Sequence, residues 1–283
     1  SETLPTQEYY RVANGPIPRS AVARLLTTLP LVGGPGTGRL PQRNGRDARR
    51  QAACREPSRG LRLNEDDIDV INNPGRVTFQ AAKDGPALNG ILHLPDQPPG
   101  PFPAAAVCHP HTLMGGNMGN EMVVNVCLAL AAAGWAALRF DFRGAGSSEG
   151  FFDQGKGERD DLEGAVNFLS VQQEIDPGNL AVVGYSFGAS VALRHAAQDQ
   201  RLGRMVGIAL VKHHYDDRFL DDVSRPKLFI AGEDDPWAPA QALRGYVERL
   251  QPPKKLLVVP GADHSFSGHM SGVTDVIVEW LTE

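Results

Sequence analysis

The stretch from Leu180 to Ser190, which reads LAVVGYSFGAS, decides the fold. Its first four residues form a short apolar run that is typical of a buried parallel strand. Residues 189–197 are typical of a helix, and the segment Gly184-Tyr185-Ser186-Phe187-Gly188 joins the two. Strand, tight turn and helix in this order predict a nucleophile elbow, a sharp turn that presents a reactive side chain at its tip.

The glycines of this segment support that interpretation. In such an elbow the strand and the helix pass so closely that only glycine fits two residues before and after the tip, where Gly184 and Gly188 stand. The turn would aim the amide of Phe187 at the space above Ser186 Oγ, where a helix N-terminus favours negative charge. The sequence therefore predicts that one loop supplies a nucleophile, Ser186, and one oxyanion donor, Phe187.

Strand and helix patterns alternate from residue 104 to the end of the chain. Before them, residues 77–81 and 88–94 read as two strands joined by a hairpin turn at Asp84-Gly85. Later strands are expected at 104–108, 135–140, 180–183, 205–211, 227–231 and 255–259, with helices that include 189–197, 239–250 and 273–281. This order predicts an α/β fold with a doubly wound, mostly parallel sheet, antiparallel N-terminal strands and functional groups at the carboxyl ends of the strands.

Composition excludes several classes of protein. The chain has 283 residues, 41% of them hydrophobic and 22% charged, which is ordinary for a globular protein. No apolar run approaches the roughly 20 residues of a membrane span. The net charge of −5 argues against nucleic acid as a partner. Cys54, Cys108 and Cys127 are odd in number and lack disulfide or zinc spacing, which favours free thiols in a reducing, cytoplasmic compartment.

The N-terminal part of the chain differs from the rest. Residues 1–62 hold eleven Arg, no Lys and four acidic residues, whereas the remainder holds seventeen basic and twenty-nine acidic ones. We expect two parts: residues 1–70, a basic and poorly packed arm, and residues 71–283, the α/β domain. Translated leader sequence and an organellar transit peptide, which would imply import, are the alternatives for the arm.

A serine hydroxyl needs a neighbouring base and a carboxylate that orients the base. Both types follow the elbow at predicted strand ends. The segment 232–239, GEDDPWAP, follows one strand, and the segment 261–264, GADH, follows the next. The order Ser, Asp, His and the positions at strand ends both fit a hydrolytic triad.

The motifs GYSFG, GEDDPWAP and PGADHSF, with HPH upstream and DFRGAGSS between, resemble the α/β-hydrolase superfamily, in particular its small carboxylesterase and dienelactone-hydrolase-like branch. The resemblance covers residues 76–283. It implies Ser186 as nucleophile, His264 as general base and then acid, and Asp235 as the orienting carboxylate, with Asp234 as the alternative. It also implies that the second oxyanion amide belongs to His111 or Thr112.

The expected access to this site is open. Many members of the superfamily insert a lid after the strand that follows the elbow, but residues 212–226 are too few for a domain with its own core. An open cleft favours small esters, lactones or thioesters. Trp237, Phe187 and Phe266 are candidates for its walls, with the core as the alternative for each. His213 is a further candidate for substrate contact, against a surface role for the pair His213-His214.

Two other patterns point to different chemistry. His109-x-His111 could be a metal pair, but no third ligand with suitable spacing is evident. Gly144, Gly146 and Gly150 differ in spacing from a dinucleotide fingerprint, and the family resemblance implies a structural loop tied to the sheet by Asp141 and Arg143. We therefore expect no metal and no cofactor.

The leading hypothesis is a metal-independent serine hydrolase that cleaves a carboxylic ester or related acyl bond of a small molecule through an acyl-enzyme. A non-catalytic hydrolase-fold binding protein with a recruiting basic arm is one alternative, motivated by the eleven Arg of residues 1–62. A serine peptidase is the other.

Overall fold

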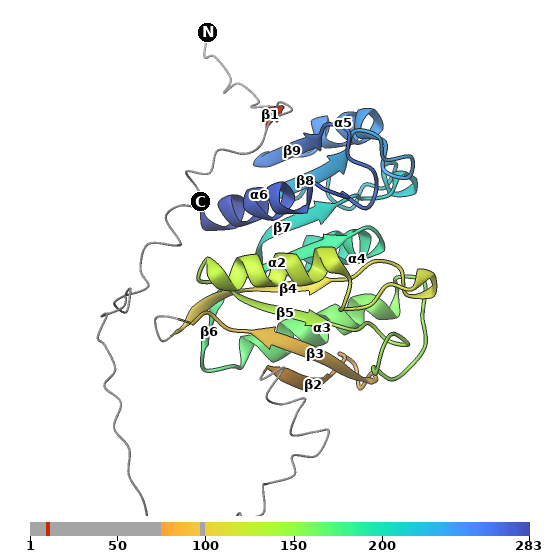
Figure 1. Cartoon of the computed structure of the whole chain (residues 1–283). Helices are drawn as coiled ribbons and strands as arrows, with labels where there is room; N and C mark the ends of the chain where they lie inside the picture. The colour runs from red at the N-terminus through yellow and green to blue at the C-terminus, as the bar shows by residue number, and fades with distance from the viewer. Residues whose placement is uncertain (1–9, 12–74, 97–99) are drawn as a thin grey trace, which may run out of the picture. The chain divides into compact units, whose positions relative to one another are not determined.

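A nine-stranded sheet runs through the part of the chain that the computed structural model describes, residues 10–11, 75–96 and 100–283 (Figure 1). Its order is β1-β9-β8-β7-β6-β4-β5-β3-β2. The strands are β1 (Tyr10–Arg11), β2 (Arg76–Gln80), β3 (Ala87–His93), β4 (Phe102–Cys108), β5 (Ala136–Phe140), β6 (Ile175–Tyr185), β7 (Leu202–Ile208), β8 (Lys227–Gly232) and β9 (Lys254–Val259). The pairs β2–β3 and β3–β5 are antiparallel and all others are parallel. The predicted fold class is confirmed.

Helices cover both faces of the sheet, and successive residues of β4 face opposite sides. The helices are α2 (Glu121–Ala132), α3 (Gly157–Ser170), α4 (Phe187–Gln198), α5 (Ala240–Glu248) and α6 (Met270–Thr282). Ala104, Ala106 and Cys108 belong to the core cluster under α3, α4 and α5, whereas Ala105 and Val107 belong to the cluster under α2 and α6. This period of two is the reason that a continuous apolar strand can support two cores.

Two residues that favour helix ends flank α2, the helix that precedes β5. The side chain of Asn120 accepts a hydrogen bond from the amide of Met122 at 3.0 Å and so caps the N-terminus of α2. Gly134, with a φ of 88°, turns the chain after its C-terminus, a conformation that favours glycine. These two residues therefore lie at the two ends of α2.

Some boundaries differ from those predicted. β7 ends at Ile208 and not at Val211, because Ala209 has a φ of 49° and leaves the extended conformation. α6 begins at Met270, three residues before the predicted start at Val273. The interpretations of residues 1–70 lie outside the described residues, except that Tyr10–Arg11 pairs in parallel with β9.

The connection between β7 and β8 contains one short 3₁₀ helix, η3 (Lys212–His214), and no lid domain. Within residues 10–11, 75–96 and 100–283, no helix combines the length and the apolar character needed to span a bilayer.

Candidate active site

Ser186 lies at the junction of β6 and α4 in a strained backbone conformation, with φ 56° and ψ −116°. Its amide donates to the carbonyl of Ile208 at 2.8 Å, which fixes the turn to the neighbouring strand. A Cβ on Gly184 would lie 2.3 Å from the carbonyl oxygen of Gly188, and one on Gly188 would lie 2.4 Å from that of Cys108. Both positions therefore require glycine, and the elbow that the sequence predicted is present.

His264 joins Ser186 to Asp235. Its Nε2 lies 2.9 Å from Ser186 Oγ, and its Nδ1 lies 2.7 Å from Asp235 Oδ2. Asp235 is buried, whereas Asp234 is exposed and the structure records no contact between it and the imidazole. The structure thus brings together the three side chains that the motifs singled out, and Asp235 is the carboxylate in contact with His264.

The environment of Asp235 keeps its carboxylate ionised. Burial alone would raise its pKa, but the hydrogen bond from His264 and the amides of Ala238 and Trp237 outweigh burial and hold the pKa below its ordinary value. The two amides donate to Oδ1 at 2.9 and 2.8 Å. Oδ2 is then free to accept from His264 Nδ1, and the other ring nitrogen, Nε2, faces Ser186 Oγ.

Tyr185 holds the main chain of His264. Its hydroxyl donates to the carbonyl of His264 at 2.9 Å, and the two rings stack with centroids 5.8 Å apart. Burial raises the pKa of Tyr185 to about 12, so the phenol remains a donor across the neutral range. Sequence reasoning missed this residue. The available signal was its place at the end of β6, immediately before Ser186.

The two candidate oxyanion amides lie on adjoining segments. Phe187 is the first residue of α4, so its N–H has no acceptor within the helix. His111 precedes the 3₁₀ helix η2 (Thr112–Met114), and its ring lies 5.0 Å from that of Phe187. The close approach of Gly188 to the carbonyls of Cys108 and His109 joins the elbow to the segment that carries His111. Thr112, the alternative, is the first residue of η2.

His109 is part of the scaffold. It is fully buried, its Nδ1 bonds to the carbonyl of Pro110 at 2.6 Å, and its Nε2 accepts from the amide of Phe142 at 3.0 Å. Burial lowers its pKa to about 4 despite the bond to Pro110, so the ring is neutral. His111 Nδ1 accepts from the amide of Leu113. Both ring nitrogens of His109 are thus occupied, and the described residues contain no cluster of three side chains suited to a metal ion.

The glycine-rich loop that follows β5 is tied down by buried polar contacts. Arg143 forms an ion pair with Asp161 at 2.7 Å, and its amide donates to the same carboxylate. Asp141 accepts from the amide of Met118, and a Cβ on Gly146 would lie 2.0 Å from the Asp141 carboxylate. The side chains of Arg143 and Asp141 therefore hold the loop to α3 and to the segment before α2, and not to the sheet as the resemblance implied.

The residues predicted to line the cleft differ in how far their side chains are exposed. Trp237 is 55% exposed, and its ring lies 4.8 Å from that of His264. The interpretation of Phe266 as a wall was wrong: Phe266, whose φ is 55°, is fully buried in the core cluster under α2 and α6, where its apolar ring is removed from water. His213 is exposed, and its ring packs against that of His214 in a tilted arrangement, with centroids 3.8 Å apart.

Exposed apolar side chains flank the site at two loops. Leu113 and Met114 in η2 are each 72% exposed, and Phe151 is 89% exposed. Next to Phe151, the ring of Phe152 packs at 4.6 Å against His111. We call these side chains, Leu113, Met114, Phe151 and Phe152, the apolar rim.

The sequence profile of the dienelactone hydrolase family matches residues 88–276, which is more than half of the chain. The chain belongs to the dienelactone hydrolase family. The predicted superfamily and branch are thereby confirmed, and this member of the dienelactone hydrolase family is an α/β hydrolase.

Relatives of this dienelactone hydrolase family member include proteins with and without a named activity. An uncharacterised protein of Rickettsia prowazekii (strain Madrid E) is 33% identical over 187 residues, which cover 63% of this chain and 78% of that protein. A Bradyrhizobium protein named a probable 2-oxo-3-(5-oxofuran-2-ylidene)propanoate lactonase is 27% identical over 177 residues, or 53% of this chain and 69% of that protein. A crystal structure from Xanthomonas campestris, described as an α/β serine hydrolase without lid, is 31% identical and has a TM-score of 0.64, covering 73% of this chain and 93% of that one.

Proposed function

We propose that this protein is a serine hydrolase that cleaves a carboxylic ester or a related acyl bond, such as a lactone or thioester, through an acyl-enzyme on Ser186. One observation carries the proposal: His264 bridges Ser186 and Asp235 with contacts of 2.9 and 2.7 Å. A hydroxyl, a base and an orienting carboxylate within hydrogen-bond reach form the arrangement that activates serine.

The proposed reaction has two halves. Ser186 Oγ attacks the carbonyl carbon while its proton passes to His264 Nε2, and the amides of Phe187 and His111 stabilise the negative oxygen that forms. The imidazolium, stabilised by Asp235, then returns the proton to the departing alcohol or thiol as the acyl–oxygen or acyl–sulfur bond breaks. A water molecule gives its proton to Nε2, attacks the acyl-enzyme and releases the acid, and Ser186 recovers its proton.

The surroundings of the site support small or exposed acyl groups as substrates. The short β7–β8 connection leaves the site without a lid domain, and the apolar rim offers uncharged surface to an acyl chain. Trp237, beside His264, is the proposed contact for the bound substrate, and His213 stays a prediction for the same role. The lactonase name of the Bradyrhizobium relative supports lactones among the candidate substrates.

A reducing, cytoplasmic location is also part of the proposal. Cys108 and Cys127 are buried and unpaired, which fits such a compartment. The proposed hydrolase domain comprises residues 71–283, and residues 1–70 are the proposed basic arm, of which Tyr10–Arg11 adds the strand β1 to the sheet of this domain.

A fluorophosphonate probe tests the nucleophile. The unaltered protein should be labelled, and Ser186→Ala should not be, because the probe reacts with an activated serine hydroxyl. Ser170→Ala is the matched control, since it removes the hydroxyl of a half-buried helical serine that bonds to Val166 in α3. Equal labelling of Ser186→Ala and the unaltered protein would remove Ser186 from the mechanism.

A further inference from the structure

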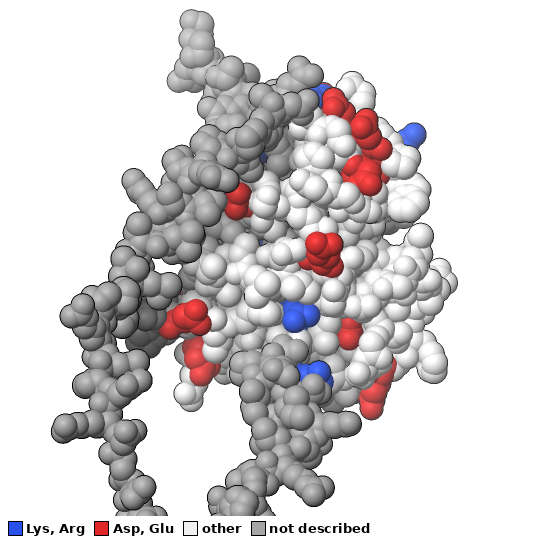
Figure 2. Space-filling model, viewed as in Figure 1, with Lys and Arg blue, Asp and Glu red and all other residues white. Residues whose placement is uncertain are grey.

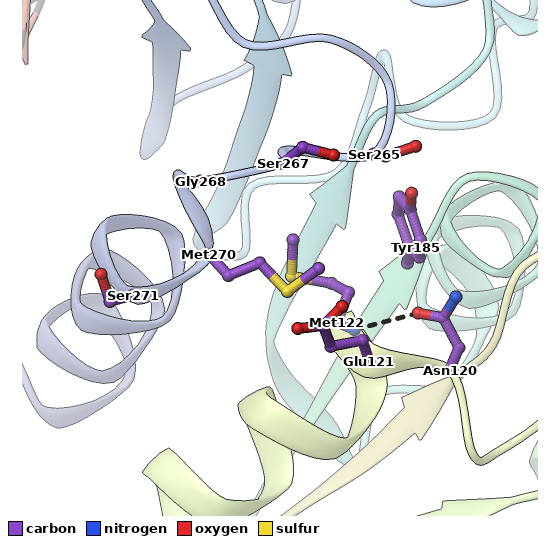
Figure 3. Close-up of a pocket in the computed structure, with 9 residues that line it drawn as sticks. All are labelled: Asn120, Glu121, Met122, Tyr185, Ser265, Ser267, Gly268, Met270 and Ser271. Atoms are coloured by element: carbon purple, nitrogen blue, oxygen red, sulfur yellow. Dashed lines mark hydrogen bonds between the residues drawn. The ribbon is translucent and has the colours of Figure 1, made fainter.

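A cavity of about 530 Å³ lies between the first residues of α2, the first residues of α6 and the loop that follows His264 (Figure 3). Figure 3 shows Met270 reaching from α6 toward Met122 of α2, with Ser265 and Ser267 from the His264 loop on one side. Asn120 and Glu121 line the cavity from the start of α2. Its volume suits a group of several heavy atoms, which is more than one bound water molecule would need.

The cavity adjoins the histidine side of the candidate active site. Tyr185, one of its walls, precedes Ser186 and holds the carbonyl of His264 at 2.9 Å. Ser265, another wall, directly follows His264. In a serine hydrolase the histidine hands its proton to the departing alcohol, so the alcohol leaves on the histidine side. The apolar rim, by contrast, lies around His111 and Phe187, which belong to the oxyanion side.

The lining of the cavity combines an apolar floor with hydroxyl and amide groups. Met122 is buried and Met270 is half-buried, and their flexible thioethers adapt to ligands of different shape. The hydroxyls of Ser265 and Ser267 can donate and accept. Asn120 Oδ1 is occupied by the Met122 amide, so the N–H groups of its side chain are what Asn120 offers to a ligand.

The charge at the cavity is negative. Glu121 is exposed at its edge, and no Lys or Arg is among its lining residues. On the face shown in Figure 2, acidic side chains are scattered over the described part and no broad basic surface is visible. A carboxylate on the departing alcohol would therefore be repelled by Glu121, and no lining Lys or Arg would offset this repulsion.

We infer that this cavity binds the departing alcohol of an ester substrate and selects a neutral, hydroxyl-bearing alcohol over one that carries a carboxylate. The inference rests on the proposed serine hydrolase function and deepens it. The acyl group occupies the oxyanion side, and the alcohol half hydrogen-bonds to the Ser265, Ser267 and Asn120 side chains above the two methionines.

Three butyrate esters test the inference: glyceryl 1-butyrate, ethyl butyrate and the butyrate ester of glycolate. All three form the same butyryl-enzyme, so differences in kcat/KM report on the step in which the alcohol is still bound. We expect kcat/KM for the glyceryl ester to exceed that for the ethyl ester. It should exceed that for the glycolate ester by about tenfold or more, because the glycolate carboxylate lies near the like charge of Glu121.

Glu121→Gln should raise kcat/KM for the glycolate ester relative to the glyceryl ester by about three- to tenfold, because it removes a nearby like charge. Glu279→Gln is the matched control, an exposed glutamate near the far end of α6, and should leave that ratio unchanged. Met270→Trp, which fills the cavity, should reduce the preference for glyceryl over ethyl ester. Each readout is the ratio of kcat/KM for two esters measured on the same variant. A lower fraction of active enzyme therefore changes both values equally and leaves the ratio unchanged.

Equal kcat/KM for the three esters, with fluorophosphonate labelling that still depends on Ser186, would overturn the cavity assignment and leave the proposed function standing. An unchanged glycolate-to-glyceryl ratio in Glu121→Gln would overturn the charge selection. Failure to hydrolyse any ester, together with labelling that does not depend on Ser186, would overturn the proposed function and the inference with it.

Discussion

Asp235→Asn is a decisive substitution, because the structure fixes how an asparagine would be oriented. Asp235 Oδ1 accepts from the amides of Trp237 and Ala238 at 2.8 and 2.9 Å, and Oδ2 faces His264 Nδ1 at 2.7 Å. An asparagine must place its carbonyl oxygen on the two amides, and its NH₂ group then faces Nδ1. That nitrogen has to accept, so the imidazole proton moves to Nε2 and Ser186 meets a donor where it needs a base.

The expected loss follows from this change of tautomer. The kcat/KM should fall by about 10³- to 10⁴-fold, which corresponds to about 4 to 5.5 kcal/mol of transition-state stabilisation. The fold should persist, since the side chain keeps its volume and its two backbone contacts.

The assay compares kcat/KM for a p-nitrophenyl ester across neutral and alkaline pH in the unaltered protein, Asp235→Asn and Asp234→Asn. The last variant is the matched control, because Asp234 is exposed beside Asp235 and has no recorded contact with His264. An Asp235→Asn enzyme that keeps more than about a tenth of its kcat/KM would refute the reasoning, because a wrong tautomer cannot be that active.

Two further predictions concern buried groups. Tyr185→Phe should lower kcat by about tenfold with little change in KM, since the loss of a hydrogen bond worth about 1 kcal/mol frees the main chain of His264. Steady-state kinetics test this prediction. The control is Tyr215→Phe, which loses a similar hydrogen bond to the carbonyl of Leu210. Lys227 is fully buried, and burial, followed by the charge of Lys254, lowers its pKa from 10.5 to about 8. Between these two pH values the unfolded chain binds the proton more tightly, so the contribution of Lys227 to the free energy of unfolding should rise with pH by up to about 3 kcal/mol. In denaturant titrations, the difference in the free energy of unfolding between the unaltered protein and Lys227→Met should therefore change with pH by this amount. A parallel pH response of the two proteins would contradict this assignment.

Much of the fold was predictable because its signals are local. The apolar run before Gly184 and the spacing of Gly184 and Gly188 predict the elbow, since the close backbone contacts there exclude a Cβ. The alternation of strands and helices then predicts the parallel sheet, which brings the ends of β8 and β9 to the same edge as Ser186. Asp235 and His264 follow those strands, so their meeting with Ser186 was also within reach of the sequence.

The rest depends on backbone conformation and on contacts between distant segments. Phe266 lies two positions after His264, which suggested a cleft wall, but its backbone has a positive φ and its side chain lies in the core. Tyr185 acts on the carbonyl of a residue 79 positions away, and no periodicity reveals such a bond. The cavity between α2 and α6 depends on how two helices far apart in sequence approach one another, and the sequence does not specify this approach.

The order of the strands has a consequence for how the protein loses activity. Ser186 follows β6, Asp235 follows β8 and His264 follows β9, and β7 lies between β6 and β8. The hairpin of β2 and β3 is at the opposite margin, beyond β5 and β4. Fraying of that hairpin would leave Ser186, Asp235 and His264 in place. A shift of β8 by one residue relative to its neighbouring strands would instead separate the Asp235 carboxylate from the His264 imidazole. Turnover would therefore report on the hydrogen-bond register of β4 and of β6 to β9, and it would report almost nothing about the β2–β3 hairpin.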